Sequence, residues 1–370
     1  MPVPDIIYLD NPASTPLDPM VAEAMFSVVS GNPHATHPLG IQASYQIESA
    51  RQQILSLAGK GRLIFTSGAT EANSLAILGM ALRELRLKGQ RRKIVSCTTE
   101  HASVLALKPI LARLGFELRL VPVTSDGQVN LERLEDELGR DVLMLSIMAV
   151  NNETGVVQDW QEIDTLAGQT IVHTDAAQAL GKLPKLPKRP DLITLSSHKV
   201  HGPQGIGALL LRRGSKPDAL LRGGGQQGGL RSGTLPTALC VGFGICCEVA
   251  QTSLADDLAR IADLSEHLIR EISDLWPGAK RVGESCVDGI VCMQLPGADA
   301  RHLLNRMPTV AASTGSACDA RTDRVSHVLR AMRVPDGRSC IRLGISRMTT
   351  RQEIDGFLNL LDHARQNLLA

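Results

Sequence analysis

Short apolar runs alternate with amphipathic segments between about residues 60 and 212, and this alternation is the feature that most narrows the fold. Apolar residues recur at helical spacing in residues 71–89 and 130–140. Seven apolar runs of strand length each end in polar or glycine-containing residues: RLIFTSG, KIVSCTTEH, FELRLVPV, DVLMLSIMAV, TIVHTDAAQ, DLITLSSHK and GIGALLLRR. Strands that are apolar throughout, with helices between them, are typical of a mostly parallel sheet covered on both faces. The sequence therefore predicts an α/β fold.

A second, smaller unit is predicted at the C-terminal end. Residues 237–276 have the pattern of one long helix, either continuous or broken, that bridges to it. The strand candidates beyond that helix fall between helical segments: GIVCMQL, TVAAST and CIRLGIS. We predict a large domain over residues 16–250 and a small α+β domain made of residues 1–15 and 251–370, as the length of 370 residues allows.

Composition excludes some classes of partner. Lys and Arg total 39 against 38 for Asp and Glu, so the net charge is +1, and neither direct nucleic-acid binding nor attachment to a membrane surface is expected. The N-terminus shows no targeting pattern, and no run approaches about 18 uninterrupted apolar residues. The eight cysteines lack CxxC spacing and fit a reducing compartment. We expect a cytoplasmic protein.

Polar residues follow five of the predicted strands. In an open α/β sheet, ligands bind beyond the carboxyl ends of the strands, so these residues are the first candidates for chemistry. They are Ser67 to Thr70, Glu100 and His101, Asn151 to Glu153, Asp175 with Gln178, and Ser196 to Lys199. Each also has a simpler structural explanation, such as a helix cap at Thr70 or a turn at Asp175. Taken together they fit one ligand.

The residue types point to a cofactor that carries a phosphate, an aromatic ring and an aldehyde. Residues 68–70 follow a strand and open a helix, where backbone N–H groups and the helix dipole favour a phosphate. Asp175 can keep a pyridine nitrogen protonated, which makes the ring an electron sink. Desolvation and cationic neighbours would lower the pKa of Lys199 enough to form a Schiff base.

Three further side chains complete this picture. His101 would lie against the face of the ring, and Asn152 and Gln178 could contact its phenolic oxygen. These groups together describe a site for pyridoxal 5'-phosphate.

Signature blocks along the chain resemble those of the cysteine desulfurases of the NifS/IscS type, in the class V branch of the fold-type I pyridoxal-phosphate enzymes. The match runs in order from residue 8 to about 347. The blocks are YLDNPASTPLDP, TSGATEAN, TEHASV, VNNETGVVQ, TDAAQALGK, SSHKVHGPQGIGAL, GGGQQGGLRSGT, STGSACDA and CIRLGISR. The resemblance implies a large domain with a seven-stranded sheet, a smaller α+β domain and a homodimer.

The resemblance also implies a role for each matching residue. Lys199 would hold the cofactor aldehyde, His101 would stack on the ring, and Asp175 would pair with its nitrogen. The other cofactor-binding positions are Ala69, Thr70, Asn152, Gln178, Ser196, His198 and Thr234, the last of which would reach the phosphate of the partner subunit. Arg342 would receive the substrate carboxylate, which suits a planar guanidinium, and Asn152 would also lie beside the substrate.

Cys318 matches the sulfur-accepting cysteine of the family. The small residues of STGSACDA allow the mobile tether that a thiol needs in order to attack the substrate and then present a persulfide elsewhere. The spacing to CIRLG resembles the long-loop group of the family. The resemblance implies conversion of L-cysteine to L-alanine, with Lys199 as base, His101 as proton carrier and the sulfur passed to acceptor or scaffold proteins, as in iron–sulfur cluster assembly.

Three departures from the family pattern stand out. Gln227 and Gly228 replace an acidic residue and an often long or charged one, so a contact near the subunit interface is expected to be missing. Ala35 replaces a serine. Asp319 follows Cys318 directly, and its negative charge would tend to raise the thiol pKa.

Other functions remain open from the sequence. On the same cofactor, a selenocysteine lyase or a cysteine or cystine C–S lyase would need no acceptor thiol, which disfavours both given Cys318. The residues His173, Asp175, His198 and His201 could instead be metal ligands of a hydrolase, but this leaves Lys199 without a role, and we predict no metal site. A third alternative is a non-catalytic platform for sulfur-accepting proteins.

Overall fold

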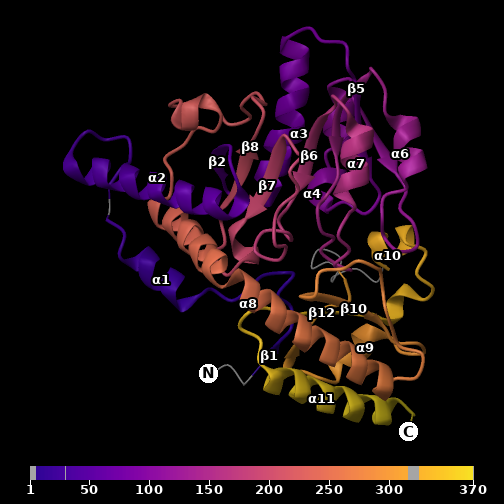
Figure 1. Ribbon diagram of the computed structural model, residues 1–370. Helices are drawn as coiled ribbons and strands as arrows, with labels where there is room; N and C mark the ends of the chain where they lie inside the picture. The colour runs from indigo at the N-terminus through magenta and orange to yellow at the C-terminus, as the bar shows by residue number, and fades with distance from the viewer. Residues whose placement is uncertain (1–5, 30, 316–324, 370) are drawn as a thin grey trace.

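The computed structural model describes residues 6–29, 31–315 and 325–369. A large sheet with helices on both faces lies beside a smaller group of strands and helices, and one long helix runs between them (Figure 1).

The large sheet has seven strands in the order β2-β8-β7-β6-β5-β3-β4. Their bounds are β2 Arg62–Thr66, β3 Lys93–Cys97, β4 Glu117–Val121, β5 Val142–Ser146, β6 Ile171–Asp175, β7 Leu192–Ser196 and β8 Gly207–Leu211. Only β8 runs opposite to the others, because it pairs antiparallel with both β7 and β2. All seven strands coincide with the predicted runs, and the predicted mostly parallel sheet is confirmed.

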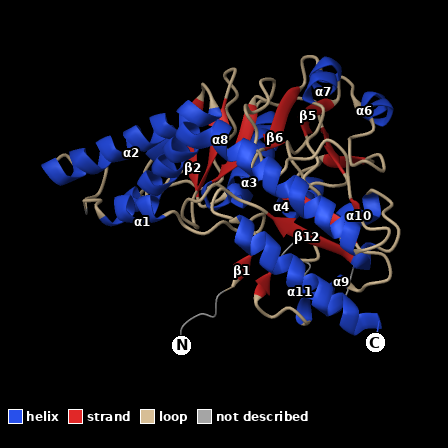
Figure 2. Cartoon of the chain, turned by 60° about the horizontal axis from the view of Figure 1, so that its bottom comes forward, coloured by secondary structure: helices blue, strands red, loops and turns tan. Residues whose placement is uncertain are grey.

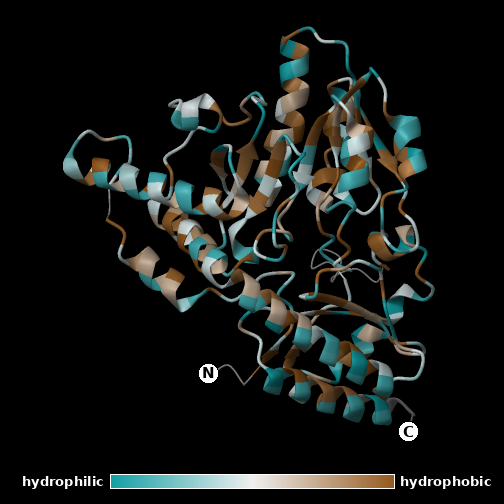
Figure 3. Ribbon diagram, in the orientation of Figure 1, coloured by the Kyte–Doolittle hydropathy of each residue, from teal (hydrophilic) through white to brown (hydrophobic). Residues whose placement is uncertain are grey.

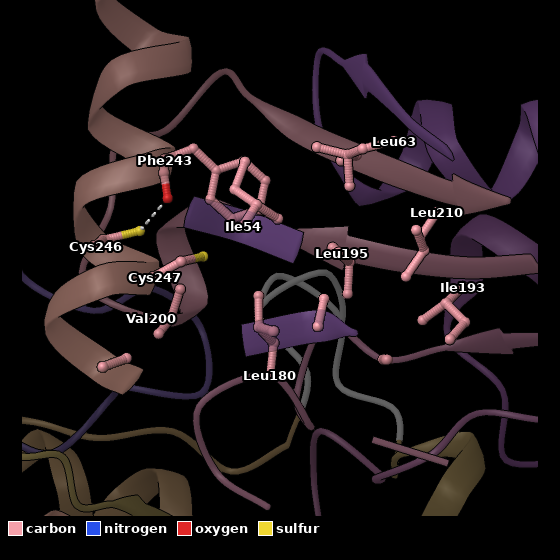
Figure 4. Close-up of a cluster of buried hydrophobic side chains, with 14 of the residues drawn as sticks. Ile54, Leu63, Leu180, Ile193, Leu195, Val200, Leu210, Phe243, Cys246 and Cys247 are labelled. Atoms are coloured by element: carbon pink, nitrogen blue, oxygen red, sulfur yellow. Dashed lines mark hydrogen bonds between the residues drawn. The ribbon is translucent and has the colours of Figure 1, made fainter. Parts of the chain in front are cut away.

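Both faces of this sheet are buried, which explains why the strands are apolar throughout. On β2, Leu63 and Phe65 pack toward α2 and α8, whereas Ile64 between them packs toward α3. Figure 4 shows the first of these clusters, where side chains of α8 and α2 meet those of the sheet. The helices of the large part are α1 Pro19–Phe26, α2 Pro38–Ala58, α3 Ala69–Arg86, α4 Ala102–Leu105, α5 Lys108–Arg113, α6 Leu131–Glu137 and α7 Trp160–Ala167.

The smaller part has a core of its own. Its antiparallel sheet has the order β12-β10-β9, and a separate parallel pair joins the N-terminal strand β1 to β11. The bounds are β1 Ile7–Tyr8, β9 Lys280–Arg281, β10 Ile290–Gln294, β11 Val310–Ala311, β12 Cys340–Gly344, α9 Ala300–Asn305, α10 His327–Ala331 and α11 Arg351–Leu369. Figure 2 shows β1 close to α11, so the N-terminal strand packs against the C-terminal helix.

Helix α8 (Thr237–Leu275) belongs to both cores. Near its start, Phe243 packs in the cluster beneath the large sheet, and near its end Leu268 packs in the cluster of the smaller part. Its 39 residues run unbroken across the predicted domain boundary at residue 250. Among the described helices, α8 alone has the length and apolar composition of a membrane span, a test that buried core helices also pass. Figure 3 shows hydrophobic residues concentrated in the strands and along the inward sides of the helices.

Candidate active site

A cavity of about 410 Å³ lies beyond the carboxyl ends of β2, β3, β5, β6 and β7, with β12 of the smaller part opposite. It contains ten of the predicted site residues: Ala69, Thr70, His101, Asn152, Asp175, Gln178, Ser196, His198, Lys199 and Arg342. The five strands point in one direction, so the residues that follow them meet at one rim. The residues that the sequence pattern singled out therefore line one cavity.

Lys199 ends the short 3-10 helix η1 (Ser197–Lys199) that follows β7. Its Nζ donates hydrogen bonds to the carbonyl oxygens of Pro12 and Ala13, at 2.6 and 2.7 Å. The N-terminal segment is held against η1 because both the N–H and the hydroxyl of Thr15 donate to the His198 carbonyl oxygen. The first residues of the chain thus form one wall of the site, which the sequence analysis did not foresee.

The turn between β2 and α3 forms a cradle for an anion. Gly68 is the N-cap residue of α3, with φ +157, and no side chain caps the helix among the described residues. Gly207 on the neighbouring strand makes the turn possible, because a Cβ there would lie 2.7 Å from the Gly68 carbonyl carbon. The first-turn carboxylate of Glu71 faces away, paired at 2.8 Å with Arg231. Ser67 donates its N–H to the same carboxylate.

Two more groups line the cavity beside this cradle, one at the end of β7 and one in η1. The hydroxyl of Ser196 is buried and has no hydrogen-bond partner among the described residues. Burial, with Lys199 and Lys182 nearby, lowers the pKa of His198 to about 4, so this imidazole is neutral at physiological pH. A neutral imidazole and a free hydroxyl can both donate to a phosphate without an ion pair.

Asp175 ends β6 and is held by two donors. The side-chain amide of Asn73 donates to Oδ2 at 2.7 Å, and the Ala177 N–H donates to Oδ1 at 2.9 Å. Asn73 lies on α3, is fully buried, and donates also to the Ser103 hydroxyl at 2.8 Å. These contacts fix the carboxylate at the floor of the cavity.

His101 is oriented by the same network. Its Nδ1 accepts the Ser103 N–H at 3.1 Å and lies 2.8 Å from the Ser103 hydroxyl, which places the ring proton on Nε2 when the ring is neutral. Burial, opposed by Asp175 and reinforced by Lys199, lowers the pKa of His101 below its ordinary value. A neutral ring with one fixed proton is suited to lie against an aromatic face.

Arg342 reaches the cavity from β12 and is only 2% exposed. Its Nη2 pairs with Asp10 at 2.7 Å, its Nη1 donates to the Asn152 carbonyl oxygen at 2.9 Å, and its Nε has no partner among the described residues. The backbone of Arg342 bridges that of Ser313, close to where the described chain breaks off at residue 315. The charged N–H groups that remain available can donate to a carboxylate.

Two predicted residues are not among the side chains that line the cavity. Thr234 is exposed on the loop before α8, where the prediction that it serves another subunit requires it to be. Cys318 and the neighbouring Asp319 lie outside the described residues. Before residues 316–324, which are not described, Gly315 lies beside the Glu153 carboxylate. After them, the Ser326 hydroxyl donates a hydrogen bond to that carboxylate.

Gln227 makes contacts that the sequence analysis did not anticipate. Its Nε2 donates to the Phe65 carbonyl oxygen at 2.9 Å, and its Oε1 accepts the Phe65 N–H at 2.8 Å. Phe65 lies on β2, an edge strand of the large sheet, so the carboxamide pairs with that strand as a neighbouring peptide would. An acidic side chain has no hydrogen to donate to Phe65, so this pairing requires the amide.

The histidines of the metal-hydrolase alternative are engaged otherwise. His173 lies between the hydroxyls of Ser146 and Thr194, and the Nδ1 of His201 contacts the Pro16 carbonyl oxygen. No group of three or more His, Cys, Asp or Glu side chains placed to hold a metal occurs within the described ranges.

Comparison with known proteins agrees with this geometry, since residues 7–357 match the class-V aminotransferase family. The chain belongs to the class-V aminotransferases. Human cysteine desulfurase is 41% identical over 371 residues, which cover 96% of this chain and 80% of the human protein. A solved NifS-like protein has a TM-score of 0.90 at 31% identity, covering 98% of this chain and 99% of that one. SspA, solved in complex with cysteine, has a TM-score of 0.81 at 30% identity over 93% of this chain and 99% of its own.

The predicted family, fold class, enzyme class and cofactor are thereby confirmed, and within the class-V aminotransferases the chain is a cysteine desulfurase that uses pyridoxal 5'-phosphate. The residues present fit this cofactor. The uncapped start of α3 and the unpartnered Ser196 hydroxyl suit its phosphate, while the firmly held Asp175 carboxylate suits its ring nitrogen.

Proposed function

We propose that this cysteine desulfurase takes sulfur from L-cysteine, releases L-alanine, and carries the sulfur as a persulfide on Cys318. The observation that carries this proposal is the meeting of Lys199, Asp175 and Arg342 in one cavity. The reaction of an amino acid on this cofactor needs three groups. They are an amine, a carboxylate that pairs with the ring nitrogen of the cofactor, and a guanidinium that binds the carboxylate of the substrate. A lyase acting on the same substrate would share these three residues, and Cys318 is what favours the desulfurase.

Different side chains would hold the cofactor and move the proton. Thr70, Ala69, Ser196 and His198 would hold the phosphate, and Asp175 would keep the ring nitrogen protonated. Pyridoxal phosphate supplies an electron sink that makes the Cα proton of the bound amino acid acidic. Lys199 removes that proton as a base, and afterwards returns a proton to the product.

Substrate binding and ring contacts involve the remaining groups. Arg342 would bind the substrate carboxylate next to Asn152. His101 would stack on the ring and donate a hydrogen bond from its Nε2–H to the substrate sulfur, since Nδ1 is already engaged by Ser103 and the lowered pKa keeps the imidazole neutral. Gln178 would donate a hydrogen bond to the phenolic oxygen of the cofactor.

The sulfur step balances without any further reactant. The Cys318 thiolate attacks the substrate sulfur, the bond between that sulfur and Cβ breaks, and the carbon framework takes up a proton to become alanine. Cys318 is three residues beyond Gly315, which lies beside Glu153, and the residue before Glu153, Asn152, lines the cavity. Three residues of extended chain span about 10 Å. This reach supports delivery of the thiol to the substrate.

A homodimer is part of the proposal. Large apolar side chains are exposed on α1 and at the start of α2, including Phe26 at 90%, Tyr45 at 76% and Met20 at 63%. Exposed apolar patches of this kind favour a protein interface. The exposed Thr234 would then complete the phosphate site of the partner subunit.

Mixing two inactive variants tests the shared site. Thr234→Ala weakens both cofactor sites of its own dimer, and Lys199→Ala abolishes catalysis. In a mixed dimer, the site with intact Lys199 receives Thr234 from the other subunit, so activity should reappear on mixing. No recovery in demonstrated mixed dimers would contradict the role of Thr234 across the interface.

We further propose that the persulfide is delivered to acceptor or scaffold proteins and that the enzyme works in the cytoplasm without binding nucleic acid or membranes itself. The near-neutral net charge of +1 supports the lack of direct nucleic-acid binding. The seven cysteines in the described ranges are all free thiols, which is consistent with a reducing compartment.

The decisive experiment compares L-cysteine turnover by the wild type, Cys318→Ala and Cys286→Ala, a control at a partly exposed cysteine. Alanine and sulfide are quantified with dithiothreitol, and the persulfide is located by mass spectrometry without it. We expect alanine and a Cys318 persulfide from the wild type and the control, and neither from Cys318→Ala. Sulfide release by Cys318→Ala at the wild-type rate would instead identify a C–S lyase.

A further inference from the structure

A chain of hydrogen bonds links Lys199 to a second lysine. The Lys199 Nζ donates to the Pro12 carbonyl oxygen at 2.6 Å, and the same oxygen accepts the Gln178 Nε2 at 2.8 Å. At the other end of the carboxamide, the Gln178 Oε1 accepts the Lys182 Nζ at 2.5 Å. Lys182 is therefore connected to the reactive amine through one side chain and one carbonyl oxygen.

This arrangement fixes which way the Gln178 carboxamide points. A lysine ammonium can only donate and a carbonyl oxygen can only accept. A flipped amide would place its NH2 group against Lys182 and its oxygen against the Pro12 oxygen, so both contacts would become repulsive. The NH2 group of Gln178 also has a second hydrogen, and the residue lines the cavity. Lys182 thus makes Gln178 a donor toward the site.

The local fold sets this spacing. After β6 the chain turns, with the Leu180 N–H donating to the Ala176 carbonyl oxygen and the Lys182 N–H donating to that of Ala179. Residues four apart in such a turn have neighbouring side chains. Lys182 is therefore held over Gln178 by backbone hydrogen bonds.

Lys182 has no ion-pair partner among the described residues. It lines a small cavity of about 50 Å³ behind Lys199, together with Asp257 of α8, Asp288, His201 and Arg347.

These neighbours do not neutralise Lys182. Neither Asp257, which accepts the Ser253 hydroxyl, nor Asp288 forms an ion pair with Lys182 among the described residues. Arg347 pairs with Asp18, and burial lowers the pKa of His201 to about 4, which leaves this imidazole neutral. Burial, then Lys199 and Arg342, lower the pKa of Lys182 itself to about 7. Lys182 is only half-buried, and an amine held beside the cations Lys199 and Arg342 instead of in an ion pair is a feature of functional sites.

We propose that Lys182 is a positioning residue of the desulfurase reaction: it holds the Gln178 amide as a donor toward the cofactor and adds positive charge behind Lys199. This rests on the roles of Lys199 and Gln178 given above. Positive charge there disfavours a protonated, positively charged nitrogen at Lys199 and favours negative charge on the phenolic oxygen.

The test is a pH titration of the visible absorption band of the holoenzyme, which reports protonation next to the cofactor rather than turnover. Lys182→Met and Lys182→Gln should move the midpoint upward by about one pH unit, because a like charge has been removed. Lys182→Arg keeps the charge and should stay near the wild-type midpoint. Lys185→Met, an exposed lysine three residues along the chain, is the matched control.

The outcomes separate this proposal from the one it rests on. A normal wild-type titration that neither uncharged variant moves, relative to Lys185→Met, would contradict the role of Lys182 alone. A wild-type holoenzyme whose visible band does not depend on pH would contradict the role of Lys199 as well. Lys182→Gln keeps an amide donor toward Gln178, so it provides the measurement if Lys182→Met does not fold.

Discussion

Replacing Arg342 by glutamine should abolish the preference of the enzyme for a substrate that carries a carboxylate. A guanidinium has five N–H donors, and two of those of Arg342 are occupied by Asp10 and the Asn152 carbonyl oxygen. Two of the remaining donors suffice for a bidentate carboxylate contact at about 1.5–3 kcal/mol per hydrogen bond. Because Asp10 already offsets part of the charge, the lower figure applies. The loss is then about 3 kcal/mol, or about 150-fold in kcat/KM.

The assay compares L-cysteine with cysteamine, which keeps the amine and the thiol but lacks the carboxylate. Arg342→Gln should lower kcat/KM for L-cysteine by about 150-fold and that for cysteamine by less than about threefold. Arg140→Gln, at an exposed arginine, should change neither value. Equal losses for both amines would refute the assignment, because they would mean that Arg342 supports the fold of the site rather than the carboxylate.

Three further variants test other parts of the structure. Gln227→Glu should lower the free energy of unfolding by about 1–2 kcal/mol, because the donor to the Phe65 carbonyl oxygen is lost; an unchanged urea midpoint would contradict this contact. Burial, then Asp175, raises the pKa of Glu100 from its ordinary value to about 8. The folded chain therefore keeps a proton that the unfolded chain releases, and stability falls as the pH rises from the ordinary pKa of a glutamic acid toward 8. Glu100→Gln should therefore raise the thermal midpoint little at pH 5 and most at pH 8, and an equal gain at both would exclude this titration. Phe357→Ala, at a fully buried side chain, should cost about 3–5 kcal/mol in the core of the smaller part, measured by urea unfolding, and a loss below 1 kcal/mol would show that the core refills the space.

The strands of the large sheet and the polar residues at its rim could be predicted from the sequence, for a physical reason. Strands buried on both faces must be apolar, and a polar residue directly after such a strand has only the rim to occupy, which is how Asp175 and Lys199 were found. The continuity of α8 was harder to predict, because its apolar pattern changes where it leaves one core and enters the other.

Contacts made by backbone atoms or across long separations could not be predicted. The carbonyl oxygens of Pro12 and Ala13 that accept from Lys199 carry no residue-specific signal. Asn73 looks like one more buried position on α3, and only the fold shows that it holds Asp175. For Gln227 the sequence suggested a missing contact, whereas the structure shows one that an acidic residue could not make.

The pairing of Gln227 with β2 bears on how this protein avoids self-association. An edge strand with free peptide groups can template another strand, and Leu63 to Phe65 form an apolar segment of the kind that enters amyloid-like stacks. The carboxamide occupies both peptide groups of Phe65 but, unlike a strand, has no further row of donors and acceptors beyond it. Together with Arg51, whose Nη1 donates to the Leu63 carbonyl oxygen, this side chain leaves the outer edge of β2 with few peptide groups that another strand could pair with.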